Sequence, residues 1–185
     1  MKTLFKKLMV AAALILAAPL ASSTVLNFDD LRGQAQLTNY GGLTFIDWSY
    51  FDYEQSPYTA ASGNVRIYNS VNENAFGRDE AFTFQGANFA GEAGVSVRFD
   101  MFLDGAYVAS SGVLLMSDTP TFLASGYTGL LNSVTVSSNK PDFFVLDDLT
   151  FNEAAPVPEP GSLALLFGAM GVLGVTARRR RQASV

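Results

Sequence analysis

The 185-residue chain contains no cysteine and no histidine. A chain without cysteine must fold without disulfide bonds, which is feasible for a domain of about 130 residues because it buries most of its surface. The two absences also exclude Ser-His-Asp and Cys-His nucleophiles, Cys/His zinc sites and haem attachment. Any catalysis would rest on carboxylates, tyrosine, lysine or serine, and no carboxylate spacing marks a glycosidase pair. We therefore expect a protein that is not an enzyme.

Basic residues are scarce between the two ends of the chain. Seven of the twelve Lys and Arg residues lie in the end segments, which leaves five against sixteen acidic residues in the region 24–153. This central region carries a formal charge of −11, which disfavours nucleic acid and anionic lipid as partners. The same charge suits solubility or the binding of divalent cations.

A sustained helical period is missing from residues 24–152. Short runs of aromatic and β-branched residues instead recur about every ten residues between glycine-rich turns, which is typical of antiparallel strands. We therefore expect residues 24–153 to form an all-β domain, an antiparallel β-sandwich that is jelly-roll-like. Spacing alone leaves the jelly-roll and immunoglobulin-like strand orders open.

Three local patterns give more specific predictions. Val95, Val97, Phe99, Met101 and Leu103 share one face of a predicted half-buried strand, with polar residues at 96, 98 and 100 on the other face. The following Asp104-Gly105 pair predicts a tight hairpin, because a two-residue turn there needs positive φ at both central positions. The polar run at 69–80 predicts a loop.

The N-terminus has the three parts of a secretory signal peptide. Lys2, Lys6 and Lys7 precede an apolar run at 8–18, and small residues follow at 21–23. The apolar run is too short to span a membrane, so residues 1–23 are interpreted as a signal peptide that is removed. The alternative is an uncleaved anchor.

The C-terminus also has three ordered parts. The linker at 154–160 contains Val157, Pro158, Glu159 and Pro160, and the following run at 161–177 has no charged side chain. As a helix this run would span roughly 25 Å, slightly less than the hydrocarbon core of a bilayer. Four arginines come next, Arg178, Arg179, Arg180 and Arg181, and should stay cytoplasmic. Residues 161–185 thus predict a single transmembrane helix with a basic tail.

This arrangement strongly resembles the PEP-CTERM sorting signal of exported proteins in Gram-negative bacteria. The residues 157–160 match its short motif, 161–177 its apolar helix and 178–181 its basic stop. The resemblance implies that a membrane-embedded exosortase recognises the motif, cleaves near it and releases the protein toward the cell surface or extracellular polymer. Before release the outer domain would lie in the periplasm, anchored to the inner membrane. From the residues alone, an ordinary tail anchor is the alternative.

The outer domain resembles a β-sandwich type that often precedes this signal. The segments that carry this resemblance are 27–31, 40–43 and 143–151. Similar last strands with a paired acidic motif occur in carbohydrate-binding jelly rolls, where an acidic residue of the terminal strands often ligates a structural calcium ion. The resemblance therefore implies candidate calcium ligands in these segments.

Two acidic pairs are the candidate metal ligands: Asp29 with Asp30, and Asp147 with Asp148. Adjacent residues of a strand face opposite sides, so one carboxylate of the second pair points inward and needs a cation, a basic partner or several N–H donors. If the first and last strands are neighbours, the two pairs come close together, and Ca²⁺ accepts carboxylate oxygens of this kind. The alternative is that these side chains accept hydrogen bonds from turn backbone.

An aromatic cluster is the candidate glycan surface. It comprises Trp48, Tyr50, Phe51, Tyr53 and Tyr58, and alternation places Trp48 and Tyr50 on one face, where they are the candidate glycan-stacking residues. The alternative is that these rings belong to the core, since aromatic side chains dominate buried area.

Together these features predict an exported, non-enzymatic surface or extracellular-matrix protein. Its expected partners are exosortase, the inner membrane for a limited time, and extracellular polysaccharide. The alternative function is a calcium-dependent carbohydrate-binding module with exposed aromatic residues.

Overall fold

The computed structural model describes residues 23–69 and 74–153, and these form strands, turns and loops without a helix. No helix in these two ranges is long and apolar enough to cross a membrane. The predicted signal peptide, apart from Ser23, and the predicted sorting motif, transmembrane segment and basic tail lie outside the described residues.

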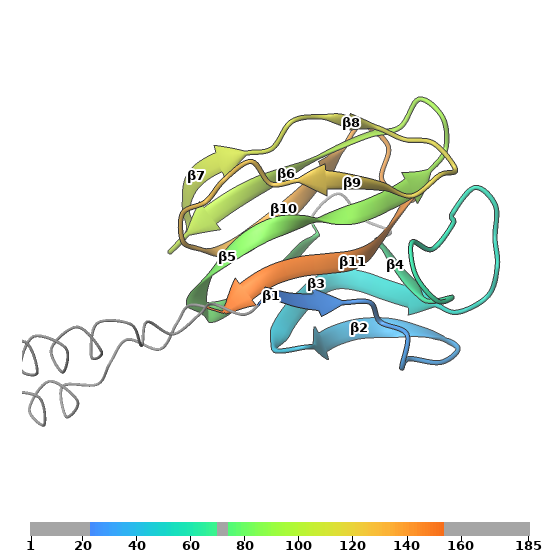
Figure 1. Cartoon of the computed structure of the whole chain (residues 1–185), viewed down its shortest axis with the longest axis horizontal. Helices are drawn as coiled ribbons and strands as arrows, with labels where there is room; N and C mark the ends of the chain where they lie inside the picture. The colour runs from blue at the N-terminus through green and yellow to red at the C-terminus, as the bar shows by residue number, and fades with distance from the viewer. Residues whose placement is uncertain (1–22, 70–73, 154–185) are drawn as a thin grey trace, which may run out of the picture. The chain divides into compact units, whose positions relative to one another are not determined.

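The described part of the chain contains eleven strands (Figure 1). They are β1 (Ser23–Leu26), β2 (Gln34–Tyr40), β3 (Leu43–Phe51), β4 (Arg66–Asn69), β5 (Ala75–Gly91), β6 (Ser96–Leu103), β7 (Ala106–Ser110), β8 (Leu114–Leu115), β9 (Thr121–Ala124), β10 (Leu131–Ser138) and β11 (Phe144–Glu153).

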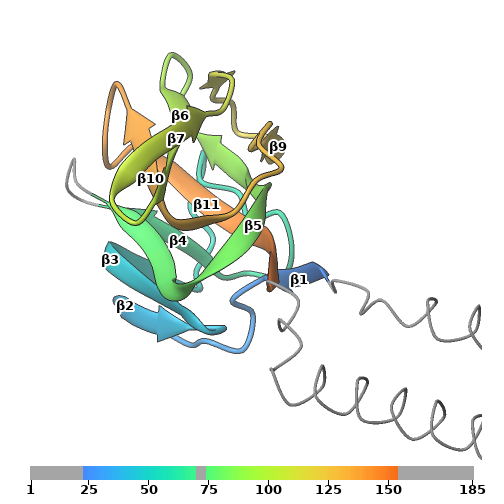
Figure 2. The same ribbon diagram turned by 90° about the vertical axis from the view of Figure 1, so that its left-hand side faces the viewer.

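Hydrogen bonds join all eleven strands into one antiparallel sheet. Eight of them follow the order β1-β11-β4-β3-β5-β10-β6-β7, while β2 pairs with β3, β8 with β6 and β9 with β5. A further pairing of β11 with β5 makes β3, β4, β11 and β5 a closed ring of neighbours, and the sheet curls accordingly (Figure 2). The predicted all-β antiparallel fold is confirmed, whereas a sandwich of two separate sheets is not.

β3 changes its partner partway along its length. Its residues Thr44–Ile46 pair with β5, and its residues Trp48–Phe51 pair with β4. Asp47, between the two segments, has a φ of 61°, a value that is uncommon for a residue with a side chain. This local irregularity lets one strand serve two neighbours and close the ring.

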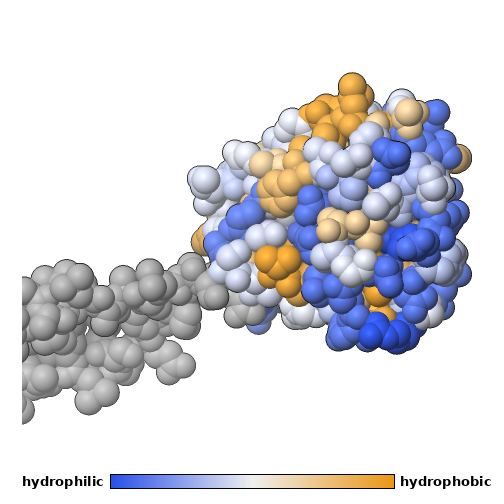
Figure 3. All heavy atoms as spheres, turned by 45° about the vertical axis from the view of Figure 1, so that its right-hand side comes forward, coloured by the Kyte–Doolittle hydropathy of each residue, from blue (hydrophilic) through white to orange (hydrophobic). Residues whose placement is uncertain are grey.

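The interior of the curled sheet holds the main core. The alternation predicted from residue 95 is confirmed at four positions, because Val95, Val97, Phe99 and Met101 are fully or almost fully buried, whereas Leu103, beside the hairpin turn, is half-buried. Phe99 packs edge-on against Phe84 with ring centroids 4.7 Å apart, a geometry that aromatic quadrupoles favour. On the face drawn in Figure 3, hydrophobic residues form separate patches within a mainly polar surface.

The Asp104-Gly105 hairpin is also confirmed. It joins β6 to β7 with Leu103 opposite Ala106, and the two turn residues have φ values of 51° and 77°. Both values are positive, as a type I′ turn requires, and this turn matches the right-handed twist of the strands.

The prediction of a loop over the whole of 69–80 is wrong. Asn69 ends β4, and from Ala75 the chain belongs to β5, which continues through Gly77 and Gly86 to Gly91. The polar residues 78–80 lie in a strand whose first part pairs with β3 and β10. Pairing of the residues on either side thus keeps this run within the strand despite its low strand propensity.

Candidate functional site

The two acidic pairs lie near each other because the first and last strands are neighbours. β1 pairs with β11 from Ser23 opposite Asn152 to Leu26 opposite Leu149. Asp29 and Asp30 follow the end of β1, while Asp147 and Asp148 lie in β11 just beyond Leu149. The condition on which the proximity of the two pairs depended, that the first and last strands are neighbours, is therefore met.

Asp147 is the buried member of its pair, with 2% of its surface exposed. Its Oδ2 accepts hydrogen bonds from the backbone N–H groups of Ala61 and Ser62 at 2.8 and 2.9 Å. Its Oδ1 accepts the N–H of Asp148 at 2.7 Å. Three backbone donors therefore satisfy the carboxylate, as a buried charge requires.

A bulge in β11 sets this orientation. Asp148 has a φ of 48°, and the register of β11 against β5 shifts between Asp147 and Thr150. Leu146 and Leu149 consequently both reach the main core, although regular alternation would place them on opposite faces. Asp147 instead lies on the outer side of the sheet, under the 52–65 loop that joins β3 to β4.

Burial raises the pKa of Asp147 from the ordinary 3.8 to about 7. The neighbouring charge of Asp148 acts in the same direction. The N–H groups of Ser62, Asp148 and Ala61 oppose it, because they stabilise the ionised form. Asp147 is therefore a carboxylate whose charge changes within the physiological pH range.

Two more carboxylates meet the same 52–65 loop. Asp148 Oδ1 accepts the hydroxyl hydrogen of Ser62 at 2.7 Å, and Asp29 Oδ1 accepts the N–H of Asn64 at 3.3 Å. Asp30 faces elsewhere and accepts the hydroxyl of Tyr40. Burial, followed by this bond, raises the pKa of Tyr40. Three of the four candidate ligands thus converge on the loop and act as its anchors.

Arg66 holds the loop from its other end. Its guanidinium donates to the carbonyl groups of Asn64 and Tyr53 at 2.6 Å each, and its Cζ lies 4.4 Å from the ring centroid of Phe51. Burial lowers the pKa of Arg66, and the nearby charge of Asp147 opposes that effect. The sequence predictions missed this residue, although its position directly after a Ser-, Pro- and Gly-rich loop was a signal for an anchor.

The calcium hypothesis for Asp29, Asp30, Asp147 and Asp148 remains a prediction. In the part of the chain that the structure describes, no group of three or more Asp, Glu, His or Cys side chains is placed to hold a metal ion. The hydrogen bonds to Ala61, Ser62 and Asn64 favour the alternative, in which these carboxylates bind turn backbone.

Calcium should therefore leave the melting temperature of the protein unchanged. The carboxylates already have backbone donors, so an ion would have to displace hydrogen bonds worth about 1 kcal/mol each to gain its ligands. Differential scanning calorimetry with added calcium, and with chelator as the control, measures this. A rise in melting temperature that grows with calcium concentration would restore the metal hypothesis.

The prediction that Trp48 stacks on glycans is wrong. Trp48 has no exposed surface and belongs to the main core. Tyr50, two residues along the same face of β3, is half-buried and packs against that core. The two rings share a face as predicted, but the face is the inner one, because the irregularity at Asp47 turns it toward the interior.

Aromatic residues do meet at the surface on the other side of the sheet. Phe51, Ala90 and Val145 form a second, smaller buried cluster, against which Tyr58 and Tyr68 pack. Beside it lies a hollow of about 210 Å³, which we call the aromatic pocket. Its walls include the rings of Phe51, Tyr53, Tyr58 and Tyr68, and its polar lining includes Gln34 and Gln55.

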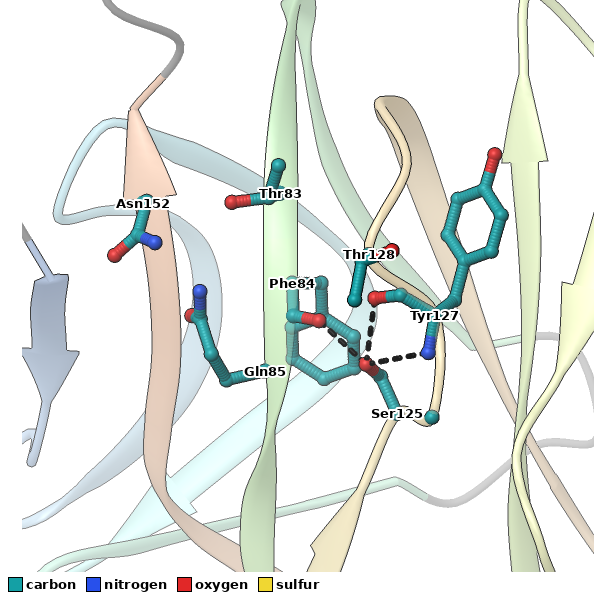
Figure 4. A pocket seen from close by; sticks show the side chains of 8 residues that line it. Thr83, Phe84, Gln85, Ser125, Tyr127, Thr128 and Asn152 are labelled. Atoms are coloured by element: carbon teal, nitrogen blue, oxygen red, sulfur yellow. Dashed lines mark hydrogen bonds between the residues drawn. The ribbon is translucent and has the colours of Figure 1, made fainter. Parts of the chain in front are cut away.

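A second hollow of about 470 Å³ lies over β5 beside the 125–128 segment (Figure 4). Its buried serine, Ser125, donates to the carbonyl oxygen of Phe84 at 2.5 Å and accepts the N–H of Tyr127 at 3.3 Å. The hydroxyl therefore fixes the segment after β9 against β5, and the described contacts supply no base that would activate it.

Comparison with known families bears on the C-terminus. The PEP-CTERM protein-sorting motif matches residues 156–181. No curated protein shows significant similarity to the chain. The matched range contains both Val157-Pro158-Glu159-Pro160 and the four arginines, as the sequence predicted. The chain therefore carries a PEP-CTERM protein-sorting motif, preceded by an all-β domain.

Proposed function

We propose that the chain is an exported, non-enzymatic protein of the cell surface or extracellular matrix, which exosortase processes at its C-terminal signal. The observation that carries this proposal is the PEP-CTERM match at 156–181, which points to an exported protein with a C-terminal membrane-anchoring signal. The all-β domain, which spans residues 24–153 once the predicted signal peptide is removed, is the part that would be delivered.

The proposed route assigns a role to each end segment. Residues 1–23 direct export, and the apolar run at 161–177 then holds the protein in the inner membrane with Arg178 to Arg181 in the cytoplasm. Pro158 and Pro160 favour an extended backbone just outside the membrane, because proline prevents helix from propagating. An extended segment at this position is accessible to a membrane-embedded protease.

A non-enzymatic role agrees with the chemistry of the domain. The chain has no histidine or cysteine, which removes the commonest bases and nucleophiles at neutral pH. Among the carboxylates, Asp147 and Asp148 are engaged by the 52–65 loop. These features support a role in binding or in structure.

Replacing Pro158, Glu159 and Pro160 by alanine should trap the protein in the inner membrane. The variant would keep its apolar anchor, but exosortase would no longer recognise it. Cell fractionation of an exosortase-containing host, with immunoblotting, measures the shift from the released form to the membrane fraction. The control is the double variant Ala154→Ser, Ala155→Ser, which alters the same linker outside the matched residues. Release of both variants at the wild-type level would reject the proposal.

A further inference from the structure

We propose that the aromatic pocket binds one sugar residue of a non-anionic polysaccharide. This inference goes beyond the sorting function and does not depend on it, because binding is measured on the isolated protein. It places the glycan contact on the outer side of the sheet, away from Trp48 and Tyr50.

The ring of Tyr53 supplies the surface on which a sugar ring would lie. It is 48% exposed, although Tyr53 lies only two residues after Phe51, the buried last residue of β3. The buried ring of Phe51 backs it, with centroids 4.9 Å apart, and Tyr68 meets Phe51 edge-on at 5.6 Å. An exposed ring supported by the buried ring of Phe51 and the half-buried ring of Tyr68 is a fixed apolar surface, and covering it with the C–H groups of a sugar is favourable.

Polar groups around these rings match the hydroxyl groups of a sugar. Gln34 donates through Nε2 to the Tyr68 hydroxyl at 2.9 Å, which leaves its amide oxygen available as an acceptor. The exposed side chains of Gln55 and Asp142 also line the pocket. Amide and carboxylate groups beside an aromatic wall offer the paired donors and acceptors that a ring of hydroxyl groups requires.

The charge of the pocket selects against acidic sugars. Asp142 lines it, and the Tyr58 hydroxyl lies 3.4 Å from Glu92. Burial raises the pKa of Tyr58, and the charges of Glu92 and Asp142 raise it further. Uronic acids and sulfated sugars would meet this negative charge, and that of the whole domain, while the residues that line the pocket include no Lys or Arg to offset it.

The size and rigidity of the pocket fit a single sugar. Its volume of about 210 Å³ is below the roughly 300–1,000 Å³ of pockets that enclose drug-sized ligands. The loop that carries Tyr53 and Tyr58 is anchored by Asp147 and Arg66. A loop held in place before binding loses little conformational entropy when the ligand arrives.

Affinity gel electrophoresis of the full-length protein tests this proposal, with a soluble neutral β-glucan, a neutral α-mannan or anionic alginate cast in the gel. The protein is kept in a detergent without a sugar headgroup. We expect at least one neutral polysaccharide to retard the wild-type protein and alginate not to. Tyr53→Ala should weaken this binding about tenfold, since a ring face is no longer covered. Tyr53→Phe should retain most of it.

Tyr107→Ala is the matched control, because Tyr107 is 60% exposed on β7 and does not line the pocket. It should bind as the wild type does. The proposal is overturned if neither neutral polysaccharide retards the wild type, if alginate alone does, or if Tyr53→Ala binds with wild-type affinity. Circular dichroism of each variant shows whether a loss of binding reflects the site or a loss of folding.

Discussion

Gly86→Ala should lower the free energy of unfolding by about 3–5 kcal/mol. Gly86 lies in β5 between two neighbours, opposite Ala124 of β9 and Thr150 of β11. Its φ is 148°, and a Cβ there would lie 2.1 Å from the carbonyl oxygen of Leu123. The substitution therefore adds backbone strain to an overlap with main-chain atoms, which a side-chain rotation does not relieve.

Urea unfolding measures this loss, and Trp48 is a suitable reporter because it is the sole tryptophan and is fully buried. Gly94→Ala is the matched control. Gly94 also has a positive φ, 85°, but no atom lies within 4 Å of the position of its Cβ. Gly94→Ala should lower the free energy of unfolding by only about 1–2 kcal/mol, because it adds the strain of the backbone conformation without an overlap. Equal losses in the two variants would contradict the close packing of β9 on β5.

The contribution of Asp147 to stability should fall as the pH rises from about 4 to about 7. The pKa of this carboxyl is about 7 in the folded protein, against an ordinary value of 3.8. Between these values the folded state holds a proton that the unfolded chain has released, so raising the pH favours unfolding. The contribution is fully present below pH 4 and lost above pH 7, and amounts to at most about 4 kcal/mol.

Asp147→Asn should remove this part of the pH dependence. Both carboxylate oxygens accept backbone N–H groups, so either orientation of the amide points its NH₂ group at a donor. The variant should therefore also be destabilised, by about 1–3 kcal/mol at low pH. Urea unfolding of both proteins between pH 4 and pH 8 measures the two effects.

Asp79→Asn is the control for this comparison, because Asp79 is an exposed carboxylate of β5. The free energy of unfolding of the Asp79→Asn variant should change with pH as that of the wild type does. If the profile of Asp147→Asn also ran parallel to that of the wild type, Asp147 would not be the titrating group.

Sequence patterns predicted the parts of the fold that depend on local chemistry. The alternation in β6 and the Asp104-Gly105 turn are read from neighbouring residues, and both are confirmed. The continuity of β5 was not predictable in this way. The residues on either side of its polar run at 78–80 pair with distant strands, 75–77 with β3 and β10, and Phe82 with β10.

The candidate site was predicted in part, for similar reasons. The pairing of β1 with β11, on which the proximity of the acidic pairs depended, is present. The side of the sheet on which each carboxylate lies was not predictable. Single irregular residues, Asp47 in β3 and Asp148 in β11, decide which side chains of those strands face inward. Periodicity assumes a regular strand, so a bulge reverses its predictions beyond that point.

The acidic pairs acquire a role that differs from the first hypothesis. Three of the four carboxylates, those of Asp29, Asp147 and Asp148, accept hydrogen bonds from the 61–64 segment and thereby fix the loop that carries Tyr53 and Tyr58. The paired acidic motif of the last strand is thus connected to the aromatic pocket through the 52–65 loop. Loss of Asp147 would affect the pocket through the position of this loop.

The central claim, that the C-terminal signal is removed during export, is tested most directly by mass spectrometry of the surface-exposed or released protein. We expect a mature form that ends before Leu163, near the Val157-Pro158-Glu159-Pro160 motif, and lacks the apolar run and Arg178 to Arg181. A surface-exposed form whose mass includes the four arginines would contradict the claim.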